Sequence, residues 1–125
     1  MEKDIRFYSA FIFIFPVIWA IKSKQNKLAI LFGFLLLTSI CYHGDYFLPY
    51  SKYVDICVAH FITITLTLYG TYMVIKGNDR YILPTLIGYF IMLSYKGFTL
   101  TKLLHSIILH CLGAIALILF TLCLR

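Results

Sequence analysis

The chain has 125 residues, of which 62% are hydrophobic and 18% aromatic, while only 13% are charged. So few charged residues cannot cover the surface of a water-soluble domain of this size. The composition therefore excludes an ordinary soluble enzyme and indicates an integral membrane protein. The formal net charge of +6 is explained by basic loops beside anionic lipid headgroups, so we expect no nucleic-acid partner.

Charged residues divide the sequence into five apolar segments, and each segment is a candidate transmembrane helix. A helix rises about 1.5 Å per residue, so crossing ~30 Å of hydrocarbon takes about 20 residues. The connections between the segments are short and polar, which predicts one all-α domain over residues 1–125, a polytopic membrane bundle of about five helices. The predicted helices cover residues 7–22, 27–44, 55–75, 81–96 and 102–124.

The first apolar segment raises the question of a cleaved signal peptide. Its leader, MEKDIR, carries two acidic and two basic residues, and no small-x-small cleavage site follows it. We therefore expect a retained transmembrane helix. Pro16 lies inside this segment and predicts a kink there, because proline has no backbone N–H to donate.

Five crossings place the N-terminus and the loops after the second and fourth helices on one side of the membrane, here called side A. The opposite side is side B. Side B carries six basic residues and side A five, so the positive-inside rule favours a cytoplasmic side B and an extracytoplasmic or lumenal side A. Those of side B are Lys22, Lys24, Lys27, Lys76, Arg80 and Arg125, and those of side A are Lys3, Arg6, Lys52, Lys96 and Lys102.

Ionisable side chains gather at one depth near side A. His43 ends the second predicted helix, Asp55 begins the third, and His105 and His110 lie in the first two turns of the fifth. Such groups are costly inside a membrane and are functional suspects by default. Ser39 and His43 are four residues apart, so they lie on one face of their helix and can address a common site.

The spacing of the last two histidines is a difficulty. His105 and His110 are five residues apart, which places them about 140° apart on an α-helix. They converge only if a π-bulge absorbs the extra residue or if the first turn frays. Asp55 and His60 have the same spacing. We assign Asp55 to the site and His60 to its surroundings or to the lipid interface.

Three imidazoles with one open position are typical of a catalytic zinc ion, which lowers the pKa of bound water to ~7 and polarises a carbonyl. On this interpretation three histidines hold Zn²⁺, while a carboxylate takes a proton from water and a hydroxyl stabilises the oxyanion. At a membrane boundary the accessible substrates are lipid amides and esters. A membrane lipid is therefore the expected substrate or ligand.

The run Ser39-x-x-Tyr42-His43, an Asp about a dozen residues later and a histidine pair before CLGAIAL together resemble a membrane superfamily. It contains the alkaline ceramidases, the progestin and adiponectin receptors, the hemolysin-III-like proteins and the myomaker-like proteins. The resemblance implies a zinc-containing membrane hydrolase with His43, His105 and His110 as metal ligands. It also implies Ser39 and Asp55 as the catalytic pair, with Asp55 as general base.

The chain departs from the family pattern in three ways. It offers five helices where the family has seven, and its histidine pair reads HSIILH, one residue longer than His-x-x-x-His. The tryptophan often seen before the final histidine is absent. Since two helices fewer leave part of the cavity without a wall, a homo-oligomer or another partner could complete it.

Plainer roles stay open for several of these residues. The hydroxyl of Ser39 could bond to the carbonyl of Leu35, four residues earlier, as serine often does inside a membrane helix. Asp55 could cap the third helix. His43 and His60 could be interfacial residues. Each of these roles places the side chain near side A without requiring a metal.

Four cysteines also need an assignment. Three lie near side A and the fourth at the far end, and no CxxC spacing occurs. Packing as small hydrophobic side chains is the leading interpretation, while a disulfide among the first three stays open if side A is oxidising. They are Cys41, Cys57, Cys111 and Cys123.

Three classes of function therefore remain. The first is a zinc-dependent hydrolase that acts on a lipid amide or ester. The second is a non-catalytic membrane protein that keeps a structural metal site and acts in lipid sensing, fusion or assembly. The third is a haem protein. Haem is disfavoured because paired haem ligands need facing helices across a wide gap, and because haem leaves Ser39 and Asp55 without a role.

Overall fold

A computed structural model describes residues 4–47, 49–98 and 101–124, apart from the side chains of residues 96 and 98. Over these residues the secondary structure is helical and contains no strand. The predicted all-α fold is therefore confirmed. Of the basic residues in the charge count of the two sides, Lys3 and Arg125 lie outside the described residues, as does the side chain of Lys96.

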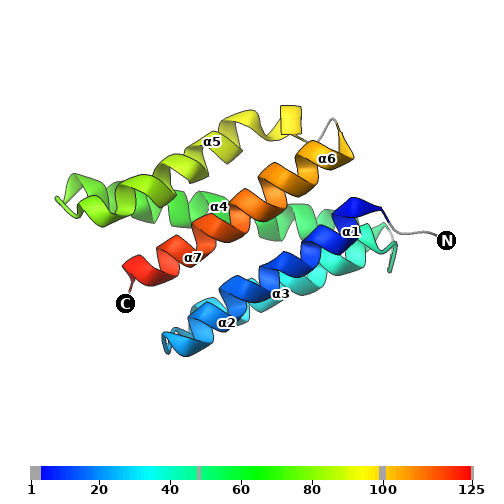
Figure 1. Ribbon diagram of the computed structural model, residues 1–125, viewed down its shortest axis with the longest axis horizontal. Helices are drawn as coiled ribbons and strands as arrows, with labels where there is room; N and C mark the ends of the chain where they lie inside the picture. Colours follow the sequence, from blue (N-terminus) through cyan, green and yellow to red (C-terminus); the bar gives the residue numbers. More distant parts are fainter. Residues whose placement is uncertain (1–3, 48, 99–100, 125) are drawn as a thin grey trace.

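The described helices form rods that run back and forth along the long axis of the molecule (Figure 1). The first rod contains a 3-10 turn shortly before Pro16, which has no N–H for the carbonyl four residues earlier, while the kink expected at Pro16 stays a prediction. The elements are α1 (Ile5–Ala10), η1 (Phe11–Phe13), α2 (Ile14–Lys22), α3 (Asn26–His43), α4 (Tyr50–Ile75), η2 (Asp79–Tyr81), α5 (Ile82–Phe98), α6 (Lys102–Leu104), the π-helix η3 (His105–Leu112) and α7 (Gly113–Cys123).

Four of the described helical stretches are long and apolar enough to cross a membrane. They are Ile5–Lys22, Asn26–His43, Tyr50–Ile75 and Lys102–Cys123. The remaining one, α5, has 17 residues, which is the lower end of the length that spans a hydrocarbon core. These lengths agree with the predicted membrane protein. The side of the membrane that the N-terminus faces stays a prediction.

Helix α4 begins earlier than the sequence suggested. Its first residue is Tyr50 and its N-cap is Pro49, so the predicted start at residue 55 and the capping role of Asp55 are wrong. The expected boundary followed the charged residues. A helix continues into the interface, however, because it pairs its own backbone groups there as it does in the hydrocarbon. Asp55 is consequently an interior residue of the second turn of α4.

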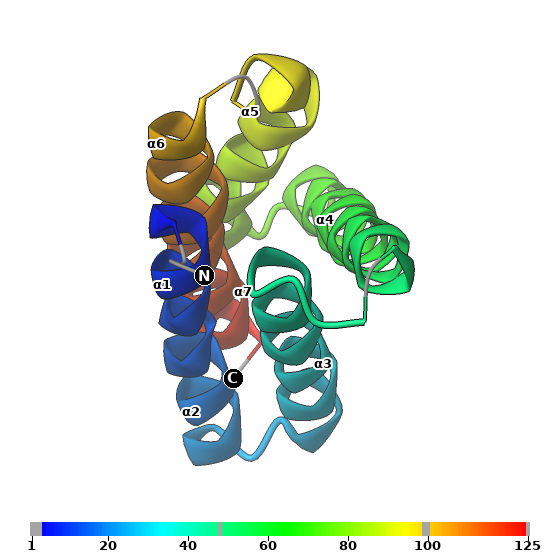
Figure 2. The ribbon, with the colours of Figure 1, turned by 90° about the vertical axis from the view of Figure 1, so that its right-hand side faces the viewer.

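The rods are arranged as a ring when viewed along the long axis (Figure 2). Along this ring α2 packs against α3, α3 against α4, α4 against α5, and α5 against α7, which packs against α2. Near the N-terminus, α1 also contacts η3 and α6 of the last rod. The N-terminal ends of α1 and α4, the C-terminal ends of α3 and α5, and α6 all lie at one end of the bundle, that of side A (Figure 1).

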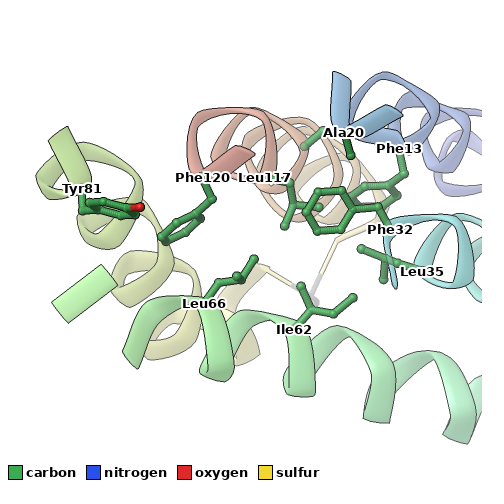
Figure 3. Packing of buried hydrophobic residues seen from close by; sticks show 10 residues of the cluster. Phe13, Ala20, Phe32, Leu35, Ile62, Leu66, Tyr81, Leu117 and Phe120 are labelled. Carbon is green, nitrogen blue, oxygen red and sulfur yellow. The ribbon is translucent and has the colours of Figure 1, made fainter. Parts of the chain in front are cut away.

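Apolar side chains from several helices pack together in the core of the bundle (Figure 3). Helices α4 and α5 approach each other closely at two glycines: a Cβ added at Gly70 would collide with Thr85, and one at Gly88 with Thr67. Small residues at such crossings are typical of membrane helices. The core residues are Phe13, Ala20, Phe32, Leu35, Ile62, Leu66, Tyr81, Ala114, Leu117 and Phe120.

Candidate metal centre

The last rod begins with a π-helix, η3, which covers His105–Leu112. Backbone hydrogen bonds in a π-helix join residues five apart, so His105 and His110 lie on the same face of the helix. Their ring centroids are 4.7 Å apart. The extra residue in HSIILH therefore does not separate the pair, because the backbone has adopted the period that the spacing requires.

Two side-chain hydrogen bonds lie at the start of this rod. The side chain of Thr101 caps the start of the rod by accepting the backbone N–H of Leu104 at 3.1 Å. One turn later the hydroxyl of Ser106 donates to the carbonyl of Lys102 at 3.0 Å. Thr63, Thr71 and Thr121 make the same bond to the carbonyl four residues earlier inside α-helices, so this bond is compatible with either backbone.

The third histidine comes from the C-terminal end of α3. The ring of His43 lies 4.9 Å from that of His105 and 5.1 Å from that of His110, measured between centroids. Each of the three offers one ring nitrogen, and these nitrogens all lie within 4.8 Å of one another. All three side chains are buried. The structure thus brings together the three residues that the sequence predicted as metal ligands.

One ring nitrogen in this cluster has no protein partner. Nε2 of His43 is buried, and no hydrogen-bond partner for it exists among the described residues. A buried polar atom without a partner is costly, and such atoms often mark a site that an ion or ligand occupies. Together with the mutual approach of the three imidazoles, this orphaned nitrogen indicates that the cluster could bind a metal ion.

The surroundings of the cluster hold the imidazole rings in place. Tyr42 stacks on His43 with ring centroids 4.5 Å apart, and Phe13 presents its edge to His110 at 5.5 Å. The hydroxyl of Ser9 lies 2.6 Å from Nδ1 of His110. Metal-binding histidines commonly bond through the second ring nitrogen to a neighbouring group in this way.

Asp55 is buried with 8% of its surface exposed, and it faces α3. Its carboxylate accepts a hydrogen bond of 3.0 Å from the hydroxyl of Thr38. The same hydroxyl lies 3.1 Å from the carbonyl of Leu35. The Leu35 carbonyl, one possible partner of Ser39 in the sequence analysis, is in contact with Thr38, which also donates to Asp55.

A single cavity of about 200 Å³ connects these side chains. Ser39, Asp55, His105 and His110 all contribute to its wall. From Asp55 to Thr67 its wall follows α4 over twelve residues, which corresponds to about 18 Å along a helix. Beyond the polar end, most of the wall is formed by apolar side chains of α4, α5 and the last rod, among them Ile62, Leu66, Ile91, Met92, Leu117 and Phe120.

His60 lies outside the histidine cluster. It is exposed, its Nδ1 is 2.9 Å from the carbonyl of Ile56 on its own helix, and its ring meets the edge of Tyr95 at 4.7 Å. It also contributes to the cavity wall. This position is compatible with both roles that the sequence left open for His60, the surroundings of the site and the lipid interface.

The four cysteines are free thiols. Cys57 is exposed and Cys41, Cys111 and Cys123 are half-buried. Cys123 contacts the segment before α5, since its thiol lies 3.2 Å from the carbonyl of Arg80. The leading interpretation of the cysteines as packing residues stays a prediction, because the redox state of side A is untested.

A cluster of charges lies at the end of the bundle next to the histidines. The Asp4 carboxylate caps α1 by accepting the backbone N–H of Arg6 at 2.8 Å, and it pairs with the Arg6 guanidinium at 2.9 Å and with Lys102 of α6 at 3.6 Å. The side-chain hydrogen bond from Arg6 outweighs the opposing effect of burial and lowers the pKa of Asp4 from 3.8 to about 2. This carboxylate therefore ties the start of α1 to the start of the last rod.

Two residues of the site escaped the sequence analysis. Ser9 and Thr38 each place a hydroxyl between a carbonyl three residues earlier and a side chain of the site, His110 for Ser9 and Asp55 for Thr38. A hydroxyl in an apolar helix is usually bonded to its own backbone, so it gives no signal of this kind. The contact between Ser9 and His110 spans 101 residues of sequence.

Comparisons of the chain with protein-family models, with curated proteins and with solved structures find no match.

Proposed function

We propose that this chain is a zinc-dependent membrane hydrolase that cleaves an amide or ester bond of a lipid. The observation that carries the proposal is the single cavity described above. It has Ser39, Asp55 and two of the three clustered histidines at one end, and mostly apolar walls along the rest of its length, where Thr63 and Thr67 are the polar lining residues. A lipid has the same division, with a polar linkage at one end and an acyl chain behind it.

The donor set suits zinc among the metals of proteins. Zinc prefers imidazole nitrogens, and a catalytic zinc takes three protein ligands and keeps a fourth position open. Zn–N distances of 2.0–2.1 Å in a tetrahedral site put the ligand nitrogens about 3.3 Å apart, and those of His43, His105 and His110 all lie within 4.8 Å of one another. The orphaned Nε2 of His43 is satisfied by such an ion.

When bound, zinc supplies Lewis-acid chemistry, since it lowers the pKa of water to ~7 and polarises a carbonyl. The remaining work belongs to the side chains. Asp55 is the general base, because its carboxylate can take a proton from the attacking water and later give it to the leaving group. The hydroxyl of Thr38 donates to Oδ1 of Asp55 and holds the carboxylate toward α3.

Ser39 supplies the second polar group. Its side chain is buried with 2% exposed, it lies one turn before His43, and it contributes to the cavity wall. A hydroxyl in this position can donate to the carbonyl oxygen of the substrate as negative charge develops on it. The apolar walls along α4, α5 and the last rod hold the acyl chain, exclude water and fix the position of the linkage.

The test compares zinc content and hydrolysis in matched variants. Asp55→Asn keeps the shape of the side chain and its bond to Thr38 but removes the proton acceptor, so we expect zinc to stay bound while hydrolysis falls by about 10²–10⁴-fold. The substrates are a ceramide and a diacylglycerol with fluorescent acyl chains, presented in detergent micelles. Asp45→Asn is the control, because Asp45 is exposed at the same end of the bundle.

The outcomes separate the classes of function. Zinc in the wild type with hydrolysis lost only in Asp55→Asn supports the hydrolase. Zinc without hydrolysis of either lipid supports a structural metal site instead. A purified wild type that holds no zinc overturns both metal-based interpretations. A Soret band in the visible spectrum points to haem, which absorbs there.

A further inference from the structure

The first helix makes a direct contact with the metal cluster through Ser9. Its hydroxyl lies 2.6 Å from Nδ1 of His110 and 3.2 Å from the carbonyl of Arg6. Ser9 lies in α1, whereas His43 comes from α3 and His105 and His110 from η3. None of the residues that the chemistry of hydrolysis requires lies in the first helix, so this contact needs a separate explanation.

The hydroxyl of Ser9 has one proton for its two contacts. A hydroxyl has one proton, and a carbonyl oxygen can only accept. When the hydroxyl of Ser9 donates to the carbonyl of Arg6, the proton in its shorter contact must come from Nδ1 of His110. The imidazole of His110 then carries its proton on Nδ1, and the lone pair of Nε2 is free to bind a metal.

The position of α1 is fixed on both sides of Ser9. At its N-terminus Asp4 caps the helix and pairs with Lys102, three residues before His105. Four residues after Ser9, on the same face of the rod, the ring of Phe13 lies edge-to-face with that of His110, with centroids 5.5 Å apart. The first rod thus contacts the imidazole of His110 through a hydroxyl and an aromatic ring.

We propose that Ser9 is a positioning residue, which holds His110 in the tautomer protonated on Nδ1 and aims its Nε2 at His43 and His105. The first helix is thereby a part of the metal site. This inference rests on the metal site of the proposed function, but it does not depend on the substrate or on catalysis. Partners of this kind typically change metal affinity by 10–100-fold when they are removed.

Competition for zinc with a chelator of known affinity tests the proposal on purified protein in detergent. Ser9→Ala is expected to weaken zinc binding by about 10–100-fold, whereas Ser9→Thr keeps the hydroxyl and restores the affinity. Thr121→Ala is the matched control. It removes a buried hydroxyl of α7 that donates to the Leu117 carbonyl, away from the histidines, and is expected to leave the affinity unchanged.

A second measurement separates positioning from loss of structure. In protein with ¹⁵N-labelled histidine and no metal, the ring nitrogens of His110, assigned with a His110→Ala variant, are expected to show the proton on Nδ1. Ser9→Ala is expected to populate the other tautomer while the far-ultraviolet circular dichroism stays helical. Restoration of the Nδ1–H tautomer in Ser9→Thr supports a hydrogen bond rather than a change in packing.

Each result has a defined meaning. If Ser9→Ala binds zinc as tightly as the wild type, or if His110 of the wild type carries its proton on Nε2, the role of Ser9 is refuted while the proposed function stands. If the wild type binds no zinc, the proposed function and the role of Ser9 in metal binding fail together.

Discussion

The two halves of the last rod have similar burial and different backbones. In η3 the residues that face the interior are His105, Ser106 and His110, whereas in α7 they are largely apolar, from Ala114 to Phe120. The apolar half follows the α-helical period, and the polar half follows the π-helical one. An α-helical backbone throughout would turn one histidine away from the site, so the irregular backbone occurs where the ligands need it.

The same contrast extends to the two ends of the bundle. At the end away from the site, Tyr81 and Phe120 pack with ring centroids 6.5 Å apart, and the hydroxyl of Tyr81 donates to the carbonyl of Cys123 at 3.1 Å. The other buried polar groups there are hydroxyls, of which Thr121 donates to the Leu117 carbonyl and Thr85 has no partner among the described residues. The site end instead buries three imidazoles and a carboxylate, and one ring nitrogen of His43 has no partner among the described residues. Packing alone does not require such an arrangement.

The largest expected effects, on zinc content and on stability, come from replacing one residue in each half of the last rod by alanine. His110→Ala removes a ligand, so we expect the zinc content to fall from about one per chain to a background value. Phe120→Ala leaves the ligands in place and creates a cavity, so we expect full zinc content and a loss of about 3 kcal/mol in the free energy of unfolding. Elemental analysis and thermal unfolding in detergent measure the two effects.

This comparison fails if the effects are exchanged. Zinc binding that survives His110→Ala, or that disappears in Phe120→Ala with the helical content unchanged, would contradict the assignment of metal binding to η3 and packing to α7. His60→Ala is the control for loss of a histidine, since His60 is exposed and lies outside the cluster.

A smaller effect is expected when the π-helix is converted to an α-helix. Deleting Ile107 brings His105 and His110 four residues apart, a spacing that shares a face on an α-helix. Since a π-helical segment holds an extra residue, the part that follows keeps its orientation. We expect zinc binding to persist and the free energy of unfolding to rise by about 1 kcal/mol, through better backbone hydrogen bonds.

The matched control deletes Ile115 in α7. Ile107 and Ile115 are equally exposed, at 49% and 50%. The second deletion rotates the rest of an α-helix by about 100° and turns Phe120 away from the core, so it should lower the melting temperature strongly. If the Ile107 deletion removes zinc binding or destabilises the protein as much as the Ile115 deletion, the view that the π-helix merely accommodates one extra residue is wrong.

The smallest effect concerns the charges beside the site. Because the pKa of Asp4 is lowered to about 2 in the folded protein, its contribution to stability is present above the unfolded value of 3.8 and is lost as the pH falls toward 2. Asp4→Asn keeps a capping side chain and removes the charge. We expect a loss of at most about 1 kcal/mol at neutral pH, and a flatter dependence of stability on pH between 4 and 2.

The control for this titration is Asp79→Asn, because Asp79 is exposed at the opposite end of the bundle. Thermal unfolding across the pH range provides the measurement. A wild type whose stability is as flat between pH 4 and 2 as that of Asp4→Asn would show that the contact of Asp4 with Arg6 and Lys102 does not stabilise the fold.

Much of the fold could be predicted from the sequence, because apolar segments between charges define membrane helices directly. Four of the described stretches meet the length and composition of a span. The start of α4 at Tyr50 was missed, since charged residues mark the edge of the hydrocarbon and not the end of hydrogen bonding. The convergence of His105 and His110 depended on a π-helix, which the spacing raised as an option but could not decide.

The approach of His43 to the other histidines followed from depth alone, since both helices arrive at the same end of the bundle. The hydroxyl partners could not be predicted in this way. Thr38 and Ser9 reach Asp55 and His110 through helix rotation, which depends on the packing of the whole ring rather than on any local pattern. A serine in an apolar helix has the same sequence signature whether it bonds to its own backbone or to a distant imidazole.

The central claim is that the three histidines bind one metal ion through the π-helical end of the last rod. X-ray absorption spectroscopy at the zinc edge, on the wild type purified in detergent, tests it most directly. The account predicts about one zinc per chain, with three histidine nitrogens at 2.0–2.1 Å and no sulfur ligand. Absence of zinc, or a sulfur ligand at about 2.3 Å from one of the neighbouring cysteines, would contradict it.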